Sequence, residues 1–408
     1  MTRHARAMQA ACLAVLAASC GGGGGGHTLT SATTTTTTAT PGSNVQSVIV
    51  DAGPADNSLN MLFVSVTVCV PGSTTNCQTI DHVQVDTGSS GLRLLASVLS
   101  ASLTLPLQHA ADGNTLVQCT QFIDGYSWGP VASADLTMGG ETAKDLPVQI
   151  IGSAAYPTVP ADCSGTGPSE DTVATFGANG ILGVGPFAQD CGTGCANSTE
   201  PGVYYSCTQT QCQPVIVPLA SQVPNPVTAF TTDNNGVVIQ LPAVAASGAL
   251  TLTGSLIFGV DTESNNKSAG TVIGLDEYGD FTTQFLGQAL TQSFIDAGSN
   301  GYFFNDASLA PCASTSDFPT FYCPASTQSL SASLQGSSGA TANASFVVSN
   351  PETVETGNPS FNVYPDLAGT SSTGDSFDWG LPFFYGRTVY TVVESRTTSA
   401  GTGPYVAF

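Results

Sequence analysis

The chain has 408 residues, enough for about two or three domains with buried cores. Apolar residues make up 41% of the chain, so it can form a core, but only 9% of residues are charged, far below the usual quarter or so. The formal net charge is −22, and so acidic a protein repels phosphate backbones, which argues against nucleic acid as a partner. A surface rich in uncharged polar residues suits a protein outside the cytoplasm.

The N-terminus has the features of a signal peptide. A basic region precedes an apolar stretch at residues 7–18 that is too short to span a bilayer. The sequence Leu-Ala-Ala-Ser-Cys that ends at Cys20 then resembles the cleavage site of bacterial lipoproteins, in which the cysteine is acylated. We predict a lipoprotein signal peptide at residues 1–19 and a lipid on Cys20. The alternative is an ordinary signal peptide cut near Ser19.

A low-complexity segment follows the predicted lipid. It contains a pure glycine run at residues 21–26 and a pure threonine run at residues 33–38. Neither run can build a core, so we predict a flexible tether at residues 20–44 that holds the rest of the chain off a membrane. The residue after Cys20 is not the Asp that tends to retain lipoproteins at the inner membrane, which favours the outer membrane.

From residue 45 onward the sequence indicates β-structure. Short apolar runs with alternating polarity are broken by Gly, Pro, Asn and Ser, and helical periodicity is scarce. Examples of such runs lie at residues 61–70, 83–85, 148–151, 236–241 and 255–260. We expect an all-β protein with a few short helices, for example at residues 95–103 and 218–223.

Ten cysteines follow Cys20, and an even number in an exported protein indicates disulfides. Their spacing suggests four local pairs, after which one longer link remains. The suggested pairs are Cys69–Cys77, Cys191–Cys195, Cys207–Cys212, Cys312–Cys323 and Cys119–Cys163. No Cys-x-x-Cys pair exists, so we predict no metal site.

One short motif occurs twice. Residues 83–91 read Val-Gln-Val-Asp-Thr-Gly-Ser-Ser-Gly, and residues 293–301 read Ser-Phe-Ile-Asp-Ala-Gly-Ser-Asn-Gly. In each copy an apolar strand-like approach leads to the aspartate, which is Asp86 in the first and Asp296 in the second. Such a repeat predicts two similar lobes. We place their boundary near residue 240, giving lobes at 45–240 and 241–408.

The motif suits paired-carboxylate chemistry. Its Gly lets backbone amides approach the carboxylate, and its Ser hydroxyl can hydrogen-bond the outer oxygen. If the two loops meet, Asp86 and Asp296 cannot both ionise at low cost, so they share one proton. One carboxyl then acts as acid and the other as base toward a water that attacks a peptide carbonyl.

These motifs resemble the two active-site motifs of the pepsin-like aspartic peptidases. Further segments at residues 179–183, 254–261 and 381–392 are similar to strands of that family, in the same order along the chain. The chain also resembles uncharacterised lipoproteins of proteobacteria. The resemblance implies a two-lobed pepsin-like fold with a cleft between barrel-like lobes, no cofactor, and a monomer. It implies Asp86 and Asp296 as the dyad, supported by Thr87, Gly88, Ser89, Gly298 and Ser299.

The sequence departs from the family pattern at several places. The second motif has Ala297 where the family has a Thr whose hydroxyl helps to join the loops, and Arg93 stands where the family has Trp. A cation there would favour ionised Asp86 and oppose proton sharing. The segment at 381–392 has Pro382 where the family has Gly. The flap hairpin over the cleft would use the aromatic residues Phe122, Tyr126 and Trp128.

Two functions remain open from the sequence. The first is an aspartic endopeptidase of the cell envelope, which hydrolyses polypeptides bound in the cleft between the lobes. The second is a catalytically inactive lipoprotein of the same fold that binds a peptide, a glycan or a protein partner. The incomplete second motif is the reason for keeping the second.

Overall fold

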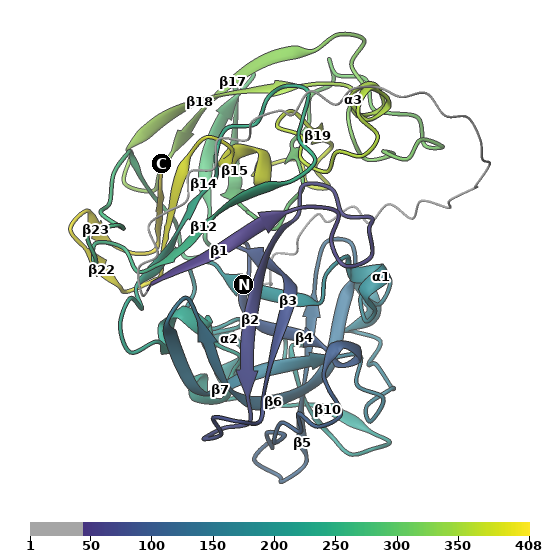
Figure 1. Cartoon of the computed structure of the whole chain (residues 1–408), viewed down its shortest axis with the longest axis vertical. Helices are drawn as coiled ribbons and strands as arrows, with labels where there is room; N and C mark the ends of the chain where they lie inside the picture. Colours follow the sequence, from purple (N-terminus) through teal and green to yellow (C-terminus); the bar gives the residue numbers. More distant parts are fainter. Residues whose placement is uncertain (1–43) are drawn as a thin grey trace.

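The computed structural model describes residues 44–408. The predicted signal peptide, Cys20 and nearly all of the predicted tether lie outside these residues. The described chain is mostly β-structure in barrel-like sheets, so the all-β prediction is confirmed. The strands of the first half of the chain lie together, those of the second half lie above them in the view, and β1 runs beside β12 (Figure 1).

The larger sheet has fifteen strands drawn from both halves of the chain. In spatial order they are β10 (Cys212–Pro214), β9 (Tyr204–Cys207), β5 (Thr115–Gln121), β6 (Tyr126–Met138), β7 (Glu141–Ile151), β4 (Ser90–Leu95), β8 (Gly180–Val184), β3 (Cys77–Asp86), β2 (Leu62–Cys69), β1 (Val45–Val50), β12 (Leu252–Phe258), β11 (Gly236–Gln240), β21 (Thr388–Val392), β24 (Tyr405–Ala407) and β13 (Val272–Gly274). An additional pairing of β6 with β2 curls the first part of the sheet on itself.

A second sheet of seven strands belongs to the later half of the chain. Its spatial order is β18 (Thr341–Val348), β17 (Gln328–Gln335), β14 (Phe281–Phe285), β15 (Gln288–Ile295), β20 (Asp378–Trp379), β16 (Tyr302–Phe303) and β19 (Ala368–Gly369). A small hairpin joins β22 (Thr397–Thr398) to β23 (Gly401–Thr402).

Helices are short, as the scarcity of helical periodicity predicts. The α-helices are α1 (Val173–Phe176), α2 (Thr193–Asn197) and α3 (Pro351–Gly357), and the 3-10 helices are η1 (Ala96–Val98), η2 (Ser164–Thr166), η3 (Leu219–Ser221), η4 (Pro226–Ala229) and η5 (Leu381–Phe384). The helices expected at residues 95–103 and 218–223 are single turns, η1 and η3. Within residues 44–408, no helix has the length and apolar character needed to cross a membrane.

The sequence repeat corresponds to a repeat of strand order. Strand β3, which ends at Asp86, pairs in parallel with β8, which pairs antiparallel with β4, which pairs in parallel with β7. Strand β15, which ends just before Asp296, pairs in parallel with β20, which pairs antiparallel with β16, which pairs in parallel with β19. Each aspartate loop therefore enters and leaves through the same four-strand arrangement.

The core and the disulfides fix these strands in place. Around β20, Trp379 is fully buried and stacks on Phe377 with 4.2 Å between ring centroids, so large aromatic rings support the second aspartate loop.

All five suggested disulfides are present, and the prediction of their pairing is confirmed. Four of them close loops of at most eleven residues, and Cys119–Cys163 ties β5 to a segment forty-four residues later.

Candidate active site

The two predicted aspartates lie together in the structure. The backbone N–H of Gly88 donates to Asp86 Oδ1 at 2.7 Å and to Asp296 Oδ1 at 3.1 Å, so one amide joins both carboxyls. The N–H of Gly298 donates to Asp296 Oδ1 at 2.7 Å. The exposed fractions of Asp86 and Asp296 are 0% and 1%. The Gly of each motif thus presents its amide to a carboxyl, as the sequence predicts.

The serine hydroxyls of the two motifs contact the outer carboxyl oxygens. Ser89 donates to Asp86 Oδ2, and Ser299 Oγ lies 3.1 Å from Asp296 Oδ2. The two contacts differ in one respect, because Ser299 Oγ also lies 2.6 Å from Asp378 Oδ2. The dyad is therefore asymmetric at its edges.

Thr87 joins the two loops through the backbone. Its hydroxyl donates to the carbonyl of Ile295 at 3.2 Å and accepts from the N–H of Ala297 at 2.9 Å. Ala297 is fully buried and has no hydroxyl with which to return these bonds. A second cross-link runs from Gln84 Nε2 to the carbonyl of Gly298 at 2.9 Å. Sequence reasoning missed Gln84, whose side chain adds a connection that the motif alone does not predict.

Burial and proximity set the protonation of the first carboxyl. Burial is the largest cause that raises the pKa of Asp86, and the neighbouring Asp296 carboxyl raises it further. Hydrogen bonds from Ser89 and Gly88 oppose this, yet the pKa of Asp86 stays well above its ordinary value. Asp86 is thus the carboxyl that retains a proton in mildly acidic solution.

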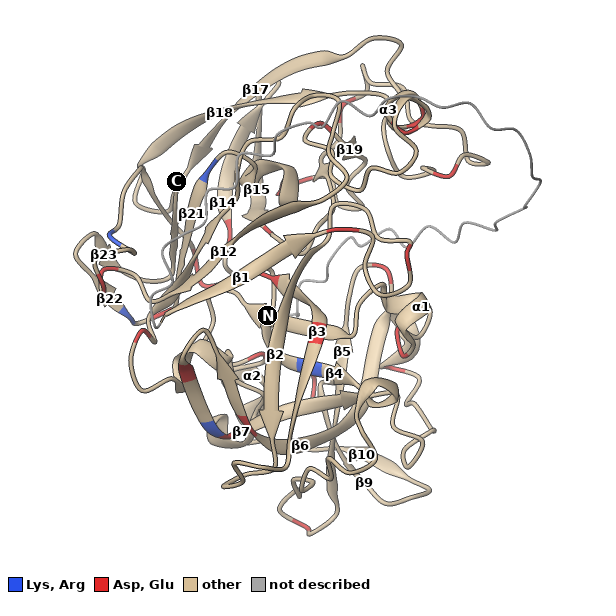
Figure 2. Ribbon diagram, in the orientation of Figure 1, with Lys and Arg blue, Asp and Glu red and all other residues tan. Residues whose placement is uncertain are grey.

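Arg93 forms its ion pair with Asp190 rather than with a carboxyl of the dyad. Its guanidinium NH2 atom lies 3.5 Å from Asp190 Oδ2, and its Nε donates to Thr120 Oγ1 at 2.9 Å. Asp190 in turn accepts from Tyr204 and Gln118. Among the charged groups that act on the pKa of Arg93, Asp190 has the largest effect and Asp86 the smallest, so the main electrostatic partner of Arg93 is Asp190. The carboxylate of Asp190 therefore balances the charge of Arg93. Elsewhere in the structure, acidic residues far outnumber basic ones (Figure 2).

A cavity of about 630 Å³ adjoins the dyad. Gly88, Ser89 and Ile295 form part of its wall, whereas Asp86 and Asp296 are not among its lining residues. Apolar residues of both halves of the chain also line it, among them Phe122, Ile123, Phe187, Leu275 and Phe294. Within residues 44–408, no group of three or more His, Cys, Asp or Glu side chains is arranged to hold a metal ion.

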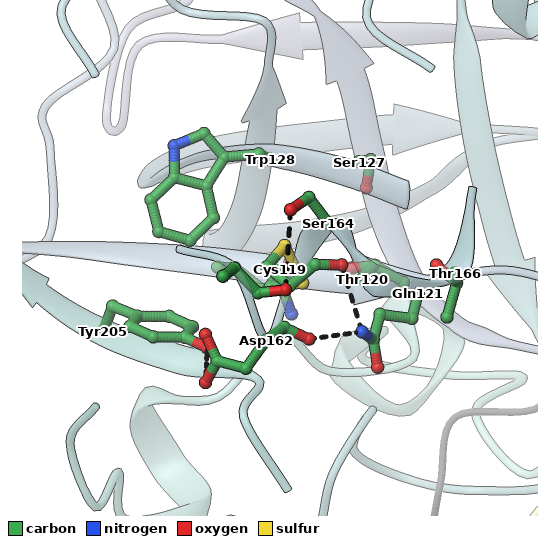
Figure 3. The surroundings of a disulfide bond; sticks show 12 residues. Cys119, Thr120, Gln121, Ser127, Trp128, Asp162, Ser164, Thr166 and Tyr205 are labelled. Carbon is green, nitrogen blue, oxygen red and sulfur yellow. Dashed lines mark hydrogen bonds between the residues drawn. A yellow bond between two sulfur atoms is a disulfide. The ribbon is translucent and has the colours of Figure 1, made fainter. Parts of the chain in front are cut away.

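The hairpin of β5 and β6 supplies the residues predicted for the flap, and only some of them reach the cavity. Phe122 and Ile123, at the turn, line it. Trp128 pairs across the hairpin with Cys119, and its ring packs edge-on against Tyr205 at 5.2 Å between centroids (Figure 3). Neither Tyr126 nor Trp128 lines the cavity. Of the three predicted flap aromatics, the structure thus brings only Phe122 to the cavity.

The turn of this hairpin contains one member of a second carboxyl pair, Asp124 and Glu170. Glu170, which is buried, shares a side-chain hydrogen bond with Asp124. The N–H of Tyr126 donates to the carbonyl of Pro168 at 3.1 Å, and the N–H of Glu170 donates to the carbonyl of Tyr126 at 2.8 Å. Burial, then the Asp124 carboxyl, raise the pKa of Glu170 to about 9.

Replacing Glu170 by glutamine should make the free energy of unfolding less dependent on pH. In the wild type the folded state holds a proton that the unfolded chain releases near the ordinary value of 4.5. The contribution of this proton to the stability of the wild type is therefore fully present below that value and is lost as pH rises toward about 9. Urea unfolding at several pH values should show Glu170→Gln gaining on the wild type by up to about 1 kcal/mol per pH unit. Exposed Glu200→Gln is the control, and a constant difference would contradict the shared proton.

Sequence reasoning also missed Asp378. It lies on β20, is 2% exposed, lines the cavity, and contacts Ser299 as described above. Burial is the largest cause that raises its pKa, followed by the Asp296 carboxyl. The only available signal was its position two residues before Gly380, in the segment that supports the second loop.

Strand register corrects one sequence interpretation. Gly183 pairs with Asp86, and the N–H of Asp296 donates to the carbonyl of Trp379, which puts Gly380 in the matching place. A Cβ on Gly183 would meet Ser89 and Gly91, and a Cβ on Gly380 would meet Ser299 and Gly301. Gly380 is therefore the counterpart of Gly183, and treating Pro382 as a substituted glycine was wrong.

Comparison with known sequences gives a family but no activity. Residues 40–408 match the family model described as "Protein of unknown function (DUF3443)". No curated protein matches the chain. Because the matched region covers most of the 408 residues, the chain belongs to the family DUF3443, described as proteins of unknown function.

Proposed function

We propose that this protein is an aspartic endopeptidase of the cell envelope, with a two-lobed pepsin-like fold. The observation that carries the proposal is the meeting of Asp86 and Asp296, whose carboxyls accept from the same N–H of Gly88 at 2.7 and 3.1 Å. Two buried carboxyls so close cannot both ionise at low cost, which provides an acid and a base in one site. The matching strand order around the two loops supports the two-lobed fold.

The protonation of the dyad suggests the roles of its members. Asp86, with its raised pKa, is the acid, and Asp296, which accepts two backbone N–H bonds, is the base. Asp296 removes a proton from a water whose oxygen attacks the carbonyl carbon of a peptide bond, while Asp86 protonates the carbonyl oxygen. The tetrahedral intermediate then collapses as the leaving nitrogen takes a proton from the dyad. No covalent enzyme intermediate is required.

The cavity fits a polypeptide segment as the substrate. Its volume of about 630 Å³ and its apolar wall can bury side chains of an extended peptide. Phe122 and Ile123 contribute to this wall from the hairpin turn, and Ile123 is 41% exposed, so the turn can contact a bound chain. We propose that the hairpin of β5 and β6 covers the substrate.

The location follows from the sequence features of the N-terminus. We propose that the protein acts as a monomer anchored to the membrane, more specifically the outer membrane, through a lipid on Cys20. The Gly-rich and Thr-rich segment would let the catalytic part reach substrates away from the membrane surface. Metabolic labelling with a fatty acid would detect this lipid, and a chain without label would exclude it.

Binding without cleavage is the second candidate function. It is favoured by Ala297, which cannot return the hydrogen bonds that Thr87 makes, and by the burial of both dyad carboxyls. In this case the cavity would hold a peptide, a glycan or a protein partner while the dyad serves only to join the two halves.

Cleavage of an unfolded protein by the full chain in detergent tests the first candidate. We expect new peptides at mildly acidic pH and falling rates as pH rises above the raised pKa of Asp86, because the acid is then lost. Asp86→Asn and Asp296→Asn should each lower the rate by about a hundred- to ten-thousandfold. Absence of cleavage at every pH, or cleavage by both variants at the wild-type rate, would refute the peptidase. Peptide binding without cleavage would support the second candidate.

A further inference from the structure

The hydroxyl of Ser299 lies between two carboxyls, and only one of them belongs to the dyad. Its Oγ is 3.1 Å from Asp296 Oδ2 and 2.6 Å from Asp378 Oδ2. Asp378 pairs with Phe294 in the second repeat, at the position where Ile181 pairs with Gln84 in the first. The first repeat therefore has an apolar residue where the second has a buried carboxyl.

The number of protons decides how the three groups can bond. A serine hydroxyl carries one proton, and an ionised carboxylate can only accept. Ser299 can therefore donate to one carboxyl, and the other contact is a hydrogen bond only if that carboxyl is protonated and donates to Oγ. One of Asp296 and Asp378 must hold a proton for both contacts to be satisfied.

Asp378 is the better holder of this proton. Asp296 Oδ1 accepts from the N–H groups of Gly88 and Gly298, which stabilise a negative charge on it. Asp378 is 2% exposed, and its Oδ1 has no hydrogen-bond partner, so a charge on it would be poorly compensated. Burial, then Asp296, and last Asp86 raise the pKa of Asp378, and together they outweigh Ser299.

We propose that protonated Asp378 is a positioning residue that donates to Ser299 Oγ and so directs the Ser299 proton to Asp296 Oδ2. Asp296 then stays the ionised base of the dyad, and this role rests on the peptidase proposed above. If Asp378 loses its proton, the hydroxyl of Ser299 donates to Asp378 instead, and Asp296 Oδ2 loses its hydrogen bond from Ser299. The ionisable residues that face Asp378 are Asp86 and Asp296, and the others that line the same cavity are Arg93, Asp190, Glu277, Tyr278 and Asp280.

Two replacements of Asp378 separate positioning from packing. Asp378→Asn keeps an uncharged donor for Ser299, and Asp378→Ile supplies the residue found at the matching place in the first repeat. With the full chain in mildly acidic solution, we expect Asp378→Asn to keep kcat within about twofold. Asp378→Ile should lower kcat about tenfold with KM unchanged, the loss of one hydrogen bond to a charged group. Exposed Asp375→Asn is the control.

The Ser299→Ala background tests the route through the hydroxyl. Without Ser299 Oγ, changing Asp378 to Ile should lower kcat no further. A tenfold loss that persists in Ser299→Ala, or equal kcat values for Asp378→Asn and Asp378→Ile, would overturn the positioning role.

A measurement without substrate separates this proposal from the peptidase. If Asp378 is protonated in the folded protein, its contribution to stability is lost as pH rises above the unfolded value of 3.8, and Asp378→Asn lacks this part of the pH dependence. The urea midpoint of Asp378→Asn should therefore rise relative to the wild type between about pH 4 and pH 7. A constant difference would overturn the proton on Asp378 even if peptides are cleaved. A rising difference without any cleavage would support that proton while the peptidase fails.

Discussion

Replacing Arg93 by methionine is expected to lower the free energy of unfolding by about 3–5 kcal/mol near neutral pH. Arg93 and Asp190 have side-chain exposures of only 1% and 6%, so the variant leaves a carboxylate buried without its cation. The carbonyls of Ser90 and Gly91 also lose the N–H groups that Arg93 donates to them. Urea unfolding monitored by tryptophan fluorescence would measure the loss.

The loss should grow with pH. Burial raises the pKa of Asp190 to about 6, and Arg93 opposes that rise. Without Arg93 the pKa of Asp190 rises further, so the variant is penalised most above about pH 6, where the wild-type carboxyl is ionised. Adding Asp190→Asn should recover most of the loss at high pH. Exposed Lys144→Met should change stability by less than about 0.5 kcal/mol, and a loss that is equal at pH 5 and pH 8 would contradict the ion pair.

The repeat made the centre of the site predictable. Asp86 and Asp296 are more than two hundred residues apart. Their shared pattern of an apolar approach followed by Gly and Ser required two similar turns, and the structure joins these turns through Gly88 and Thr87. The disulfides were predictable for a related reason, because most of the cysteines have a partner close by in the sequence.

The groups around that centre could not be predicted, because single polar residues carry no pattern. Asp378 becomes part of the site only through the pairing of β20 with β15, and Asp190 only through its ion pair with Arg93. Arg93 could be located beside the first loop, but its partner lies 97 residues further along the chain. The flap aromatics show a similar limit, because the orientation of Trp128 depends on its pairing with Cys119.

The register of the second loop also depends on strand pairing that the sequence does not show. This register leads to a prediction at Gly380. The Pro382 interpretation came from matching apolar residues in the sequence, whereas hydrogen bonding sets the frame two residues earlier. A Cβ on Gly380 would lie 2.1 Å from the carbonyl oxygen of Gly301 and 2.7 Å from that of Ser299. Both atoms are backbone of the loop that carries Ser299, so a rotamer change cannot relieve the clash.

Gly380→Ala should therefore destabilise the protein by about 3 kcal/mol or more, because the loop at residues 299–301 has to move. Gly374→Ala is the matched control, since a Cβ there has no neighbour within 4 Å and should leave the urea midpoint nearly unchanged. Gly183→Ala, whose Cβ would lie 2.8 Å from the backbone N of Gly91, should also destabilise the protein. If Gly380→Ala unfolds at the same urea concentration as Gly374→Ala, Gly380 is not the close-contact glycine of the second repeat. The correspondence between the two aspartate loops would then have to be redrawn.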